Sequence, residues 1–296
     1  MKRHAFSDCH PAVTFLWFVS VIALSVCVMH PICLTISVLV SFLYNAHLKG
    51  RKAVHFAAFR VLPLMLITAF VNPAFTHKGM TILTYLPSGN PLTLESILYG
   101  IAAAAMIGAA LQWFSCYNEV MTSDKAVYLF GRIIPALSLV ISMALRFVPR
   151  FSAQYKKVHE ARQMLHPEEA SGFINRMKSG VAVLSSMITW SLEDAVETGD
   201  SMRGRGYGLP GRTAYSIYRF DARDCGLLLW ILGSLGIMIA GRVLHLTDFR
   251  CYPFIQGKEA TPLLGLYMIV YAALFVTPLV LDLMEERNFR RLREHT

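Results

Sequence analysis

Residues 9–48 read CHPAVTFLWFVSVIALSVCVMHPICLTISVLVSFLYNAHL and contain no Asp, Glu, Lys or Arg. An α-helix needs about 20 apolar residues to cross the hydrocarbon core of a bilayer, which is ~30 Å thick. As one helix, this stretch would reach ~60 Å, about twice the thickness of the core. We therefore expect two spans joined by a tight turn at His30-Pro31, because proline is disfavoured inside a helix.

Further uncharged runs indicate a polytopic membrane protein. Together with the first stretch they predict about six spans, near residues 12–29, 31–48, 61–77, 95–115, 224–243 and 261–281. The hydrophobic content of 55% also favours this class over a soluble domain. Lys2 and Arg3 precede the first run, but no small-residue cleavage site follows, so we expect a retained span rather than a signal peptide. The predicted fold class is all-α, with about six transmembrane helices and a helical cytoplasmic region.

The basic residues are unevenly distributed over this topology. With the N-terminus in the cytoplasm, 24 of the 28 Lys and Arg residues lie in inside segments. Cytoplasmic loops of membrane proteins carry such an excess. The net charge of +9 is therefore interpreted as an orientation signal, with both termini cytoplasmic, and not as a footprint for nucleic acid.

Cysteine and histidine give no sign of a metal or cofactor. The six cysteines show no CxxC pair, and the ten histidines are scattered. This pattern predicts neither a disulfide framework nor a zinc site. No Walker motif occurs either, so any ATP hydrolysis is expected in a partner protein.

Residues 122–148 resemble another span, but we expect them at the cytoplasmic interface. Arg132 and Arg146 enclose only 13 uncharged residues, and Pro135 falls among them. A helix of that length covers about 20 Å, which is less than the core. An additional crossing would also move the basic segment 150–221 to the outside. A short seventh span remains the alternative.

Residues 149–221 form the sizeable polar region, which we expect to be helical. One helix is predicted from Phe151 to Leu165, ending before His166-Pro167 because the residue before proline resists the α conformation. A second helix is indicated by apolar or small residues at spacings of three or four, and this stripe is expected to pack on neighbouring helices. The stripe consists of Phe173, Met177, Val181, Leu184, Ile188, Leu192, Ala195, Gly199 and Met202. Gly206 directly after Arg205 predicts a glycine stop.

Both predicted helices carry an arginine near their C-terminal end, and here the chain resembles a known family. The segment LEDAVETGDSMRGRGY (192–207), and SMALRFVPRF (142–151) leading to HEARQ (159–163), resemble the paired Ala-Arg-Gly motifs of the transmembrane coupling (T) component of energy-coupling factor (ECF) transporters, which include cobalt and vitamin uptake systems. HKGMTIL (77–83) and LTLESILYG (92–100) also match. The first motif departs from the family pattern at Gln163, and the second departs at Gly204.

The resemblance implies that the two motifs dock onto partner ATPases. The residues it assigns to docking are Ala161, Arg162, Gln163, Gly204, Arg205 and Gly206, with Arg203, Glu193 and Glu197 in supporting positions. The predicted spans and the polar region divide the chain into residues 1–121 as transmembrane helices 1–4, 122–221 as interfacial and cytoplasmic coupling helices, and 222–296 as transmembrane helices 5–6 with a basic tail.

Partners and activity follow from the same resemblance. The family joins two cytoplasmic ABC ATPase subunits to a small membrane substrate-binding (S) subunit. The expected function is that of a non-catalytic coupling subunit in the cell membrane of a bacterium or archaeon. It would serve uptake of a vitamin or a transition-metal ion such as cobalt or nickel. The chain itself does not identify the substrate.

Other functions fit the sequence less well. A zinc protease is suggested by His159-Glu160, but a second His is needed at position 163, where Gln stands. A Mg²⁺ site for prenyl transfer would need a second acidic cluster beside Glu193, Asp194, Glu197 and Asp200, and we expect these carboxylates to balance nearby cations instead. The closer alternative is the permease of a conventional ABC importer, whose Glu-Ala-Ala loop pattern is not reproduced at Glu160-Ala161.

Overall fold

The computed structural model contains two compact units. One comprises Met1–Ala126 with Tyr218–Thr296, and the other comprises Val127–Ile217. The structure describes residues 5–75, 81–85, 91–131, 135–165, 172–209, 218–244 and 262–294.

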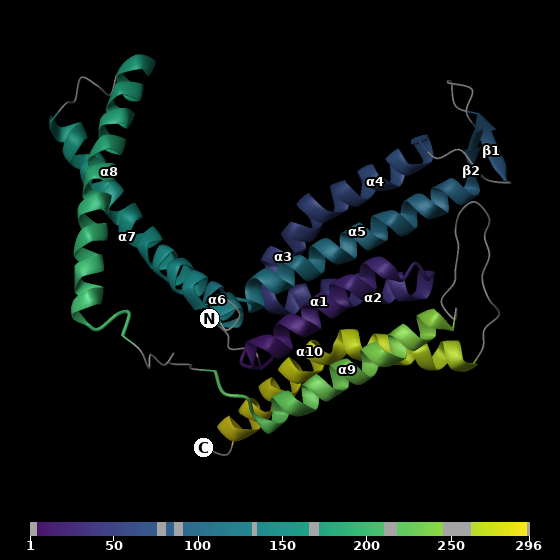
Figure 1. Ribbon diagram of the computed structural model, residues 1–296. Coiled ribbons are helices and arrows are strands. Elements are labelled where there is room, and N and C mark those ends of the chain that lie inside the picture. The colour runs from purple at the N-terminus through teal and green to yellow at the C-terminus, as the bar shows by residue number, and fades with distance from the viewer. Residues whose placement is uncertain are drawn as a thin grey trace. The chain divides into compact units, whose positions relative to one another are not determined.

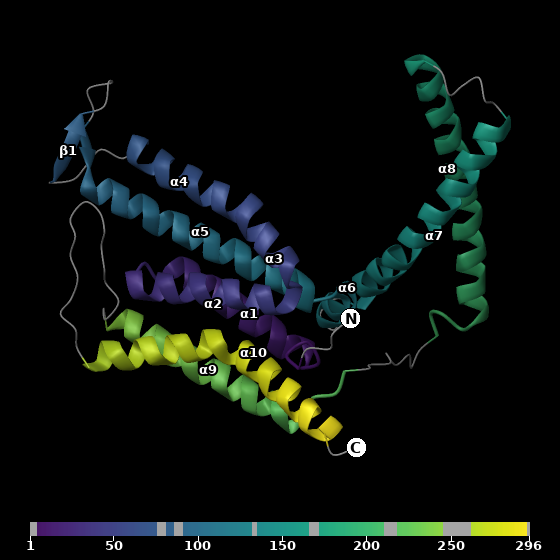
Figure 2. The ribbon, with the colours of Figure 1, turned by 180° about the vertical axis from the view of Figure 1, so that it is seen from behind.

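Long helices lying side by side make up the first unit (Figures 1 and 2). Their bounds are α1 Pro11–Cys27, α2 Pro31–Lys49, α3 Arg51–Phe56, the π-helical turn η1 Ala57–Val61, α4 Leu62–Phe75, α5 Leu94–Val120, α9 Ala222–Val243 and α10 Pro262–Glu294. A small antiparallel sheet pairs β1 (Ile82–Tyr85) with β2 (Pro91–Thr93), an element that was not predicted from the sequence.

Five helical stretches are long and apolar enough to cross a membrane. They are Pro31–Lys49, Arg51–Phe75, Leu94–Val120, Ala222–Val243 and Pro262–Asn288. Five of the predicted spans fall on them, and the remaining one falls on the shorter apolar helix α1. Helix α1 ends at Cys27 and α2 begins at Pro31, which confirms the break at His30-Pro31. The all-α polytopic fold class is therefore confirmed.

The core of this unit is aromatic. The Trp113 ring on α5 lies 5.4 Å from Trp17 on α1 and 5.6 Å from Phe275 on α10, centroid to centroid. The indole N–H of Trp17 donates to the Leu274 carbonyl at 3.1 Å, so the polar edge of this buried ring is satisfied. Edge-to-face rings and that hydrogen bond hold α1, α5 and α10 together.

Small residues bring α5 close to α4. A Cβ placed on Gly100 would lie 2.9 Å from the Ala69 carbonyl oxygen. A Cβ on Gly108 would lie 2.5 Å from the Met65 sulfur. Close backbone approach through small residues is how membrane helices gain packing energy without a hydrophobic drive. Gly100 can therefore be replaced only if α4 moves away, whereas a side chain at Gly108 would displace the flexible Met65 side chain.

Three charged side chains hold the N-terminal turn of residues 5–10. The Phe6 N–H donates to Asp282 at 3.0 Å, and the His10 N–H donates to Asp224 at 3.1 Å. The Lys125 ammonium donates to the Ser7 carbonyl at 2.5 Å and to the Ser7 hydroxyl at 3.0 Å. Buried charges are tolerated where hydrogen bonds replace the lost water, so the turn joins α9, α10 and the segment after α5.

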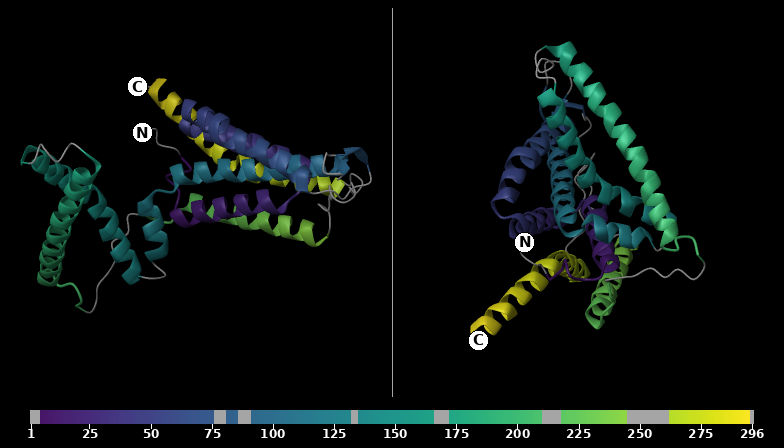
Figure 3. Two further views of the ribbon diagram at one scale, coloured as in Figure 1. Left: turned by 90° about the horizontal axis from the view of Figure 1, so that it is seen from above. Right: turned by 90° about the vertical axis from the view of Figure 1, so that its left-hand side faces the viewer.

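The second unit contains two long crossing helices (Figure 3). Helix α6 (Ser123–Gly131) leads toward α7 (Pro135–Leu165), and α8 (Phe173–Gly204) follows. The prediction that the first helix begins at Phe151 was wrong, because α7 begins at Pro135 and continues through Pro149. The edge-to-face pair of Phe147 with Phe151, at 6.2 Å, bridges the turn that proline weakens. Among the described helices, α7 is not one of the candidate spans.

Candidate functional site

Helices α7 and α8 are fastened where they cross by an ion pair. The Arg150 guanidinium contacts both carboxylate oxygens of Asp194, at 2.7 and 3.1 Å. The Asp194 side chain is only 7% exposed, whereas that of Arg150 is 55% exposed. Two-point contact between a planar guanidinium and a carboxylate is the strongest form of such a pair.

Aromatic rings surround this ion pair. The Arg150 guanidinium carbon lies 5.6 Å from the centre of the Trp190 ring. Trp190 also meets Phe151 edge to face at 5.2 Å. Since Trp190 and Asp194 are four residues apart on α8, they share one helix face. We call Arg150, Phe151, Trp190 and Asp194 the crossing clamp.

The crossing clamp was not predicted from the sequence, and it corrects one expectation. Asp194 had been expected to balance cations close to it in sequence, but its partner stands 44 residues away on another helix. The one local sequence feature that indicates the crossing clamp is a carboxylate four residues after a tryptophan. It does not indicate which cation forms the ion pair with that carboxylate.

Arg162 also contacts the opposite helix. Its Nε–H donates to the Ser179 hydroxyl at 3.1 Å, and its side chain is half-buried. The C-terminal end of α7 therefore lies beside the N-terminal part of α8, so the two helices run antiparallel. Neighbouring Ala161 and Gln163 are exposed, and the Gln163 amide nitrogen lies 3.0 Å from a ring nitrogen of His159.

The first motif therefore has a partly fixed arginine between two accessible residues. Helix α7 ends at Leu165, in agreement with the predicted stop, while His166 and Pro167 lie outside the described residues. Gln163, which departs from the family pattern, still lies inside the helix, so no glycine is needed at this position to end it.

The second motif ends α8 with a hydrogen-bonded glycine turn. Gly206 has φ of +82°, its N–H donates to the Arg203 carbonyl at 3.0 Å, and the Tyr207 N–H donates to the Met202 carbonyl at 3.0 Å. These two bonds define the Schellman motif, which satisfies the last carbonyls of a helix. The predicted glycine stop is confirmed, and it leaves the exposed Arg205 at the cap of the helix.

The structure does not bring the two motifs together. About 26 residues of helix and cap separate Ser179, the contact of Arg162, from Arg205, which is roughly 40 Å along the axis. Arg162 and Arg205 thus lie at opposite ends of α8.

In the part of the chain that the structure describes, the side chains at the supporting positions form no ion pair with the second motif, although the Arg203 carbonyl takes part in its cap. Glu193, Glu197 and Arg203 are exposed, and none of them takes part in an ion pair within the described parts of the chain. Glu193 stands about 18 Å from Arg205 along the helix, which is beyond contact. The expected short-range charge pairing is therefore not observed.

The apolar stripe of α8 does not pack on neighbours, contrary to expectation. Its larger residues are exposed by 52 to 79%: Phe173, Met177, Val181, Leu184, Ile188 and Leu192. The buried residues of α8 are Val183, Met187 and Asp194 instead. A single helix can cover only one face of its neighbour, and α7 covers the face that carries Asp194. We call the six exposed residues the outer stripe.

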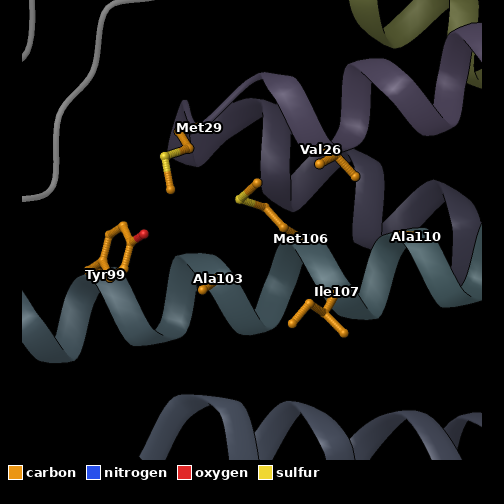
Figure 4. Close-up of a pocket in the computed structure, with 7 residues that line it drawn as sticks. All are labelled: Val26, Met29, Tyr99, Ala103, Met106, Ile107 and Ala110. Atoms are coloured by element: carbon orange, nitrogen blue, oxygen red, sulfur yellow. The ribbon is translucent and has the colours of Figure 1, made fainter. Parts of the chain in front are cut away.

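The structure has a cavity in the first unit and a groove in the second, and both are lined mainly by apolar groups. A cavity of about 270 Å³ lies between the end of α1 and α5, where Val26 and Met29 face Tyr99 and Met106 (Figure 4). A groove of about 400 Å³ lies at the helix crossing, between Tyr155 and Met187. Within the described residues, no three His, Cys, Asp or Glu side chains converge as a metal site would require.

Comparison with known proteins gives consistent relatives. No family model matches the chain. The energy-coupling factor transporter transmembrane protein EcfT of Lactobacillus helveticus is 30% identical over 120 residues, which is 40% of this chain and 43% of that protein. EcfT of Lacticaseibacillus paracasei is 32% identical over 148 residues, covering 49% and 54% of the two chains. EcfT of Listeria innocua is 25% identical over 191 residues, covering 59% and 70%.

The chain spans about half the length of the first two relatives, at 43% and 54%. All three relatives carry the same name, and the resemblance read from the arginine motifs pointed to the same protein. The long apolar helices of the structure are those of a multi-pass membrane protein. The chain is therefore similar, over 40 to 59% of its length, to energy-coupling factor transporter transmembrane proteins.

Proposed function

We propose that this chain is the transmembrane coupling subunit of an ECF-type importer. It would transmit the motion of two cytoplasmic ABC ATPase subunits to a membrane S subunit that captures the substrate. The observation that carries this proposal is the helix pair α7–α8, which is clamped at its crossing and bears one motif arginine at each far end. The names of the relatives support it independently.

Docking would rest on Arg162 and Arg205. A guanidinium at a helix end can hold a carboxylate of an acidic groove by two parallel hydrogen bonds. Roughly 40 Å between the arginines leaves room for one ATPase at each end. Arg205 is exposed at its cap, and Arg162 lies half-buried beside Ser179, so each places a positive charge at one end of the pair.

Coupling requires that ATP changes the contacts made by these ends. A ligand shifts a conformational equilibrium only through its differential affinity for the two states. Closure of the ATPases would move the docked ends relative to each other, and the crossing clamp would transmit that movement as rotation of a rigid pair. A loose crossing would instead absorb the movement within the pair.

The outer stripe suits the S subunit. Six large apolar side chains, each at least half exposed, form a surface of the kind that marks a protein or membrane contact. Because α8 carries the stripe and Arg205 together, a partner resting on the stripe would move with the docked end. The transported substrate is proposed to be a vitamin or a cobalt or nickel ion, taken up across a bacterial or archaeal cell membrane.

Orientation is part of the proposal, with both termini and the α7–α8 pair in the cytoplasm. The support is the 24 of 28 basic residues on that side. A cysteine placed at the exposed Lys157 of a cysteine-free variant tests it. An impermeant maleimide should leave this cysteine unmodified in intact cells and modify it after lysis. Labelling in intact cells would overturn the orientation.

The central test is co-purification of the Arg162→Ala/Arg205→Ala double variant with its ATPases. Each lost charge-assisted contact should weaken docking by about 1.5–3 kcal/mol. The matched control removes two exposed cations of the same helices, Lys157→Ala/Lys178→Ala. Loss of the ATPases in the first variant alone supports the proposal, and equal recovery from both refutes it. Recovery of a soluble binding protein in place of an S subunit would favour a conventional ABC permease.

A further inference from the structure

A basic segment joins α2 to α4 and begins a continuous helical rod. Helix α3, the turn η1 and α4 together run from Arg51 to Phe75, 25 residues. That length is about 37 Å, more than the ~30 Å of the hydrocarbon core. The first turn of the rod, with Arg51 and Lys52, can therefore lie at the level of the lipid headgroups, beside the end of α5 (Figure 2), and the long Arg60 side chain can reach that level from further along the rod.

The π-helical turn aligns the cations of this segment. A π turn has i→i+5 hydrogen bonds and accommodates one residue more than an α turn. Arg60 is eight residues after Lys52 and lies inside η1, whose wider turn shifts it toward the face that carries Lys52. Positions seven apart share a helix face. Phe59, also inside η1, is eight residues after Arg51 and is shifted toward the face of Arg51 in the same way.

Ring contacts hold two rows of side chains in place. The first row is Arg51, His55 and Phe59, and the second is Lys52, Phe56 and Arg60. In the first row the rings of His55 and Phe59 lie 4.3 Å apart. In the second, the Arg60 guanidinium carbon lies 5.7 Å from the centre of the Phe56 ring. Phe59 is 70% exposed, so an apolar ring stands among the cations on the outer surface.

The cations are accessible and take part in no ion pair elsewhere in the described structure. Arg51, Lys52 and Arg60 are all exposed. Glu119, the carboxylate at the end of α5, is engaged by Lys49 at 3.6 Å. Three positive charges thus face outward with no carboxylate of the described chain to balance them.

We propose that Arg51, Lys52 and Arg60 bind the phosphate headgroup of an anionic phospholipid, with Phe59 resting at the acyl boundary. Juxtamembrane cations attract anionic headgroups, and aromatic rings are enriched at this level of the bilayer. The segment directly follows the candidate span Pro31–Lys49 and begins the candidate span Arg51–Phe75, which favours a lipid over a soluble acidic protein.

The test compares lipid retention by two variants of the full chain in detergent, measured by native mass spectrometry. Arg51→Gln/Lys52→Gln removes two cations from the site. Lys156→Gln/Lys157→Gln removes two exposed cations from α7 and is the matched control. Phosphatidylglycerol is the anionic probe, phosphatidylcholine is the zwitterionic one, and inorganic phosphate is the competitor.

We expect the α3 variant to bind phosphatidylglycerol about 25-fold more weakly, because each of the two cations near an anionic surface contributes about fivefold. The α7 variant and phosphatidylcholine binding should be unchanged, and phosphate should not compete. Equal loss in both variants, or displacement by phosphate, would overturn the site. Unchanged phosphatidylglycerol binding by the α3 variant would also overturn it, and loss of the ATPases from that variant on co-purification would then assign the cations to a protein partner.

Discussion

Arg150 and Asp194 form a two-point ion pair between α7 and α8, although 44 residues separate them in sequence. The pair is asymmetric, since the carboxylate is buried and the guanidinium is half exposed. Removing Arg150 therefore leaves a buried carboxylate without its partner, whereas removing Asp194 leaves a guanidinium that water can reach.

The first prediction uses this asymmetry. Arg150→Met strands a buried carboxylate and should destabilise the helix pair by about 1–3 kcal/mol. Asp194→Asn leaves an arginine that water can solvate, and the amide can still accept a hydrogen bond, so its cost should be smaller. Thermal unfolding of the two variants in detergent measures the difference. Equal costs would mean that the carboxylate is hydrated and that the clamp is weak.

Arg205→Lys should impair transport despite keeping the charge. Lysine loses the planar fork that holds a carboxylate at two points. A capping role needs only a cation and contributes about 0.3–1 kcal/mol through the helix dipole, so lysine would serve it nearly as well. The assay is ATP-dependent uptake in proteoliposomes with all partner subunits. Arg203→Lys, on an exposed neighbour, is the control, and wild-type uptake by the Arg205 variant would reduce that residue to a cap.

Gly206→Ala should weaken ATPase recovery without altering any charge. The positive φ of +82° costs a residue with a Cβ about 1–2 kcal/mol, and the new Cβ would lie 3.1 Å from Leu209 Cδ1. The helix end that presents Arg205 would then shift.

The matched control for that substitution is Gly180→Ala on the same helix. A Cβ there meets nothing within 4 Å, and alanine is favoured over glycine inside a helix by about 1 kcal/mol. Recovery should therefore be unchanged or improved. If both variants lose the ATPases equally, the geometry of the cap is not what matters.

Lys125 predicts a pH dependence of stability. Burial lowers the pKa of Lys125 below its usual 10.5, although Asp8 and Cys9 act in the opposite direction. Between the lowered pKa and 10.5 the unfolded chain binds more protons than the folded one, so stability rises with pH. The thermal midpoint of the wild type should therefore rise relative to that of the Lys125→Met variant as the pH approaches 10.5. A constant difference across this range would contradict the buried, charged lysine.

The sequence alone determined the features whose causes are local. Uncharged runs reveal spans because the thickness of the bilayer sets the length of an apolar helix. The turn at His30-Pro31 and the stop at Gly206 follow from the backbone limits of proline and the freedom of glycine. The arginine motifs likewise pointed to the family from sequence, and the relatives agree.

Only the tertiary structure decided which residues meet across helices. The carboxylates of Asp194 and Asp282 find Arg150 and the Phe6 amide at sequence separations of 44 and 276, and no periodicity encodes such pairs. Helix α8 offers apolar residues on more than one face, so the sequence could not show that α7 covers Val183 and leaves the outer stripe exposed. Periodicity describes a single helix, whereas burial depends on where the neighbouring helix lies.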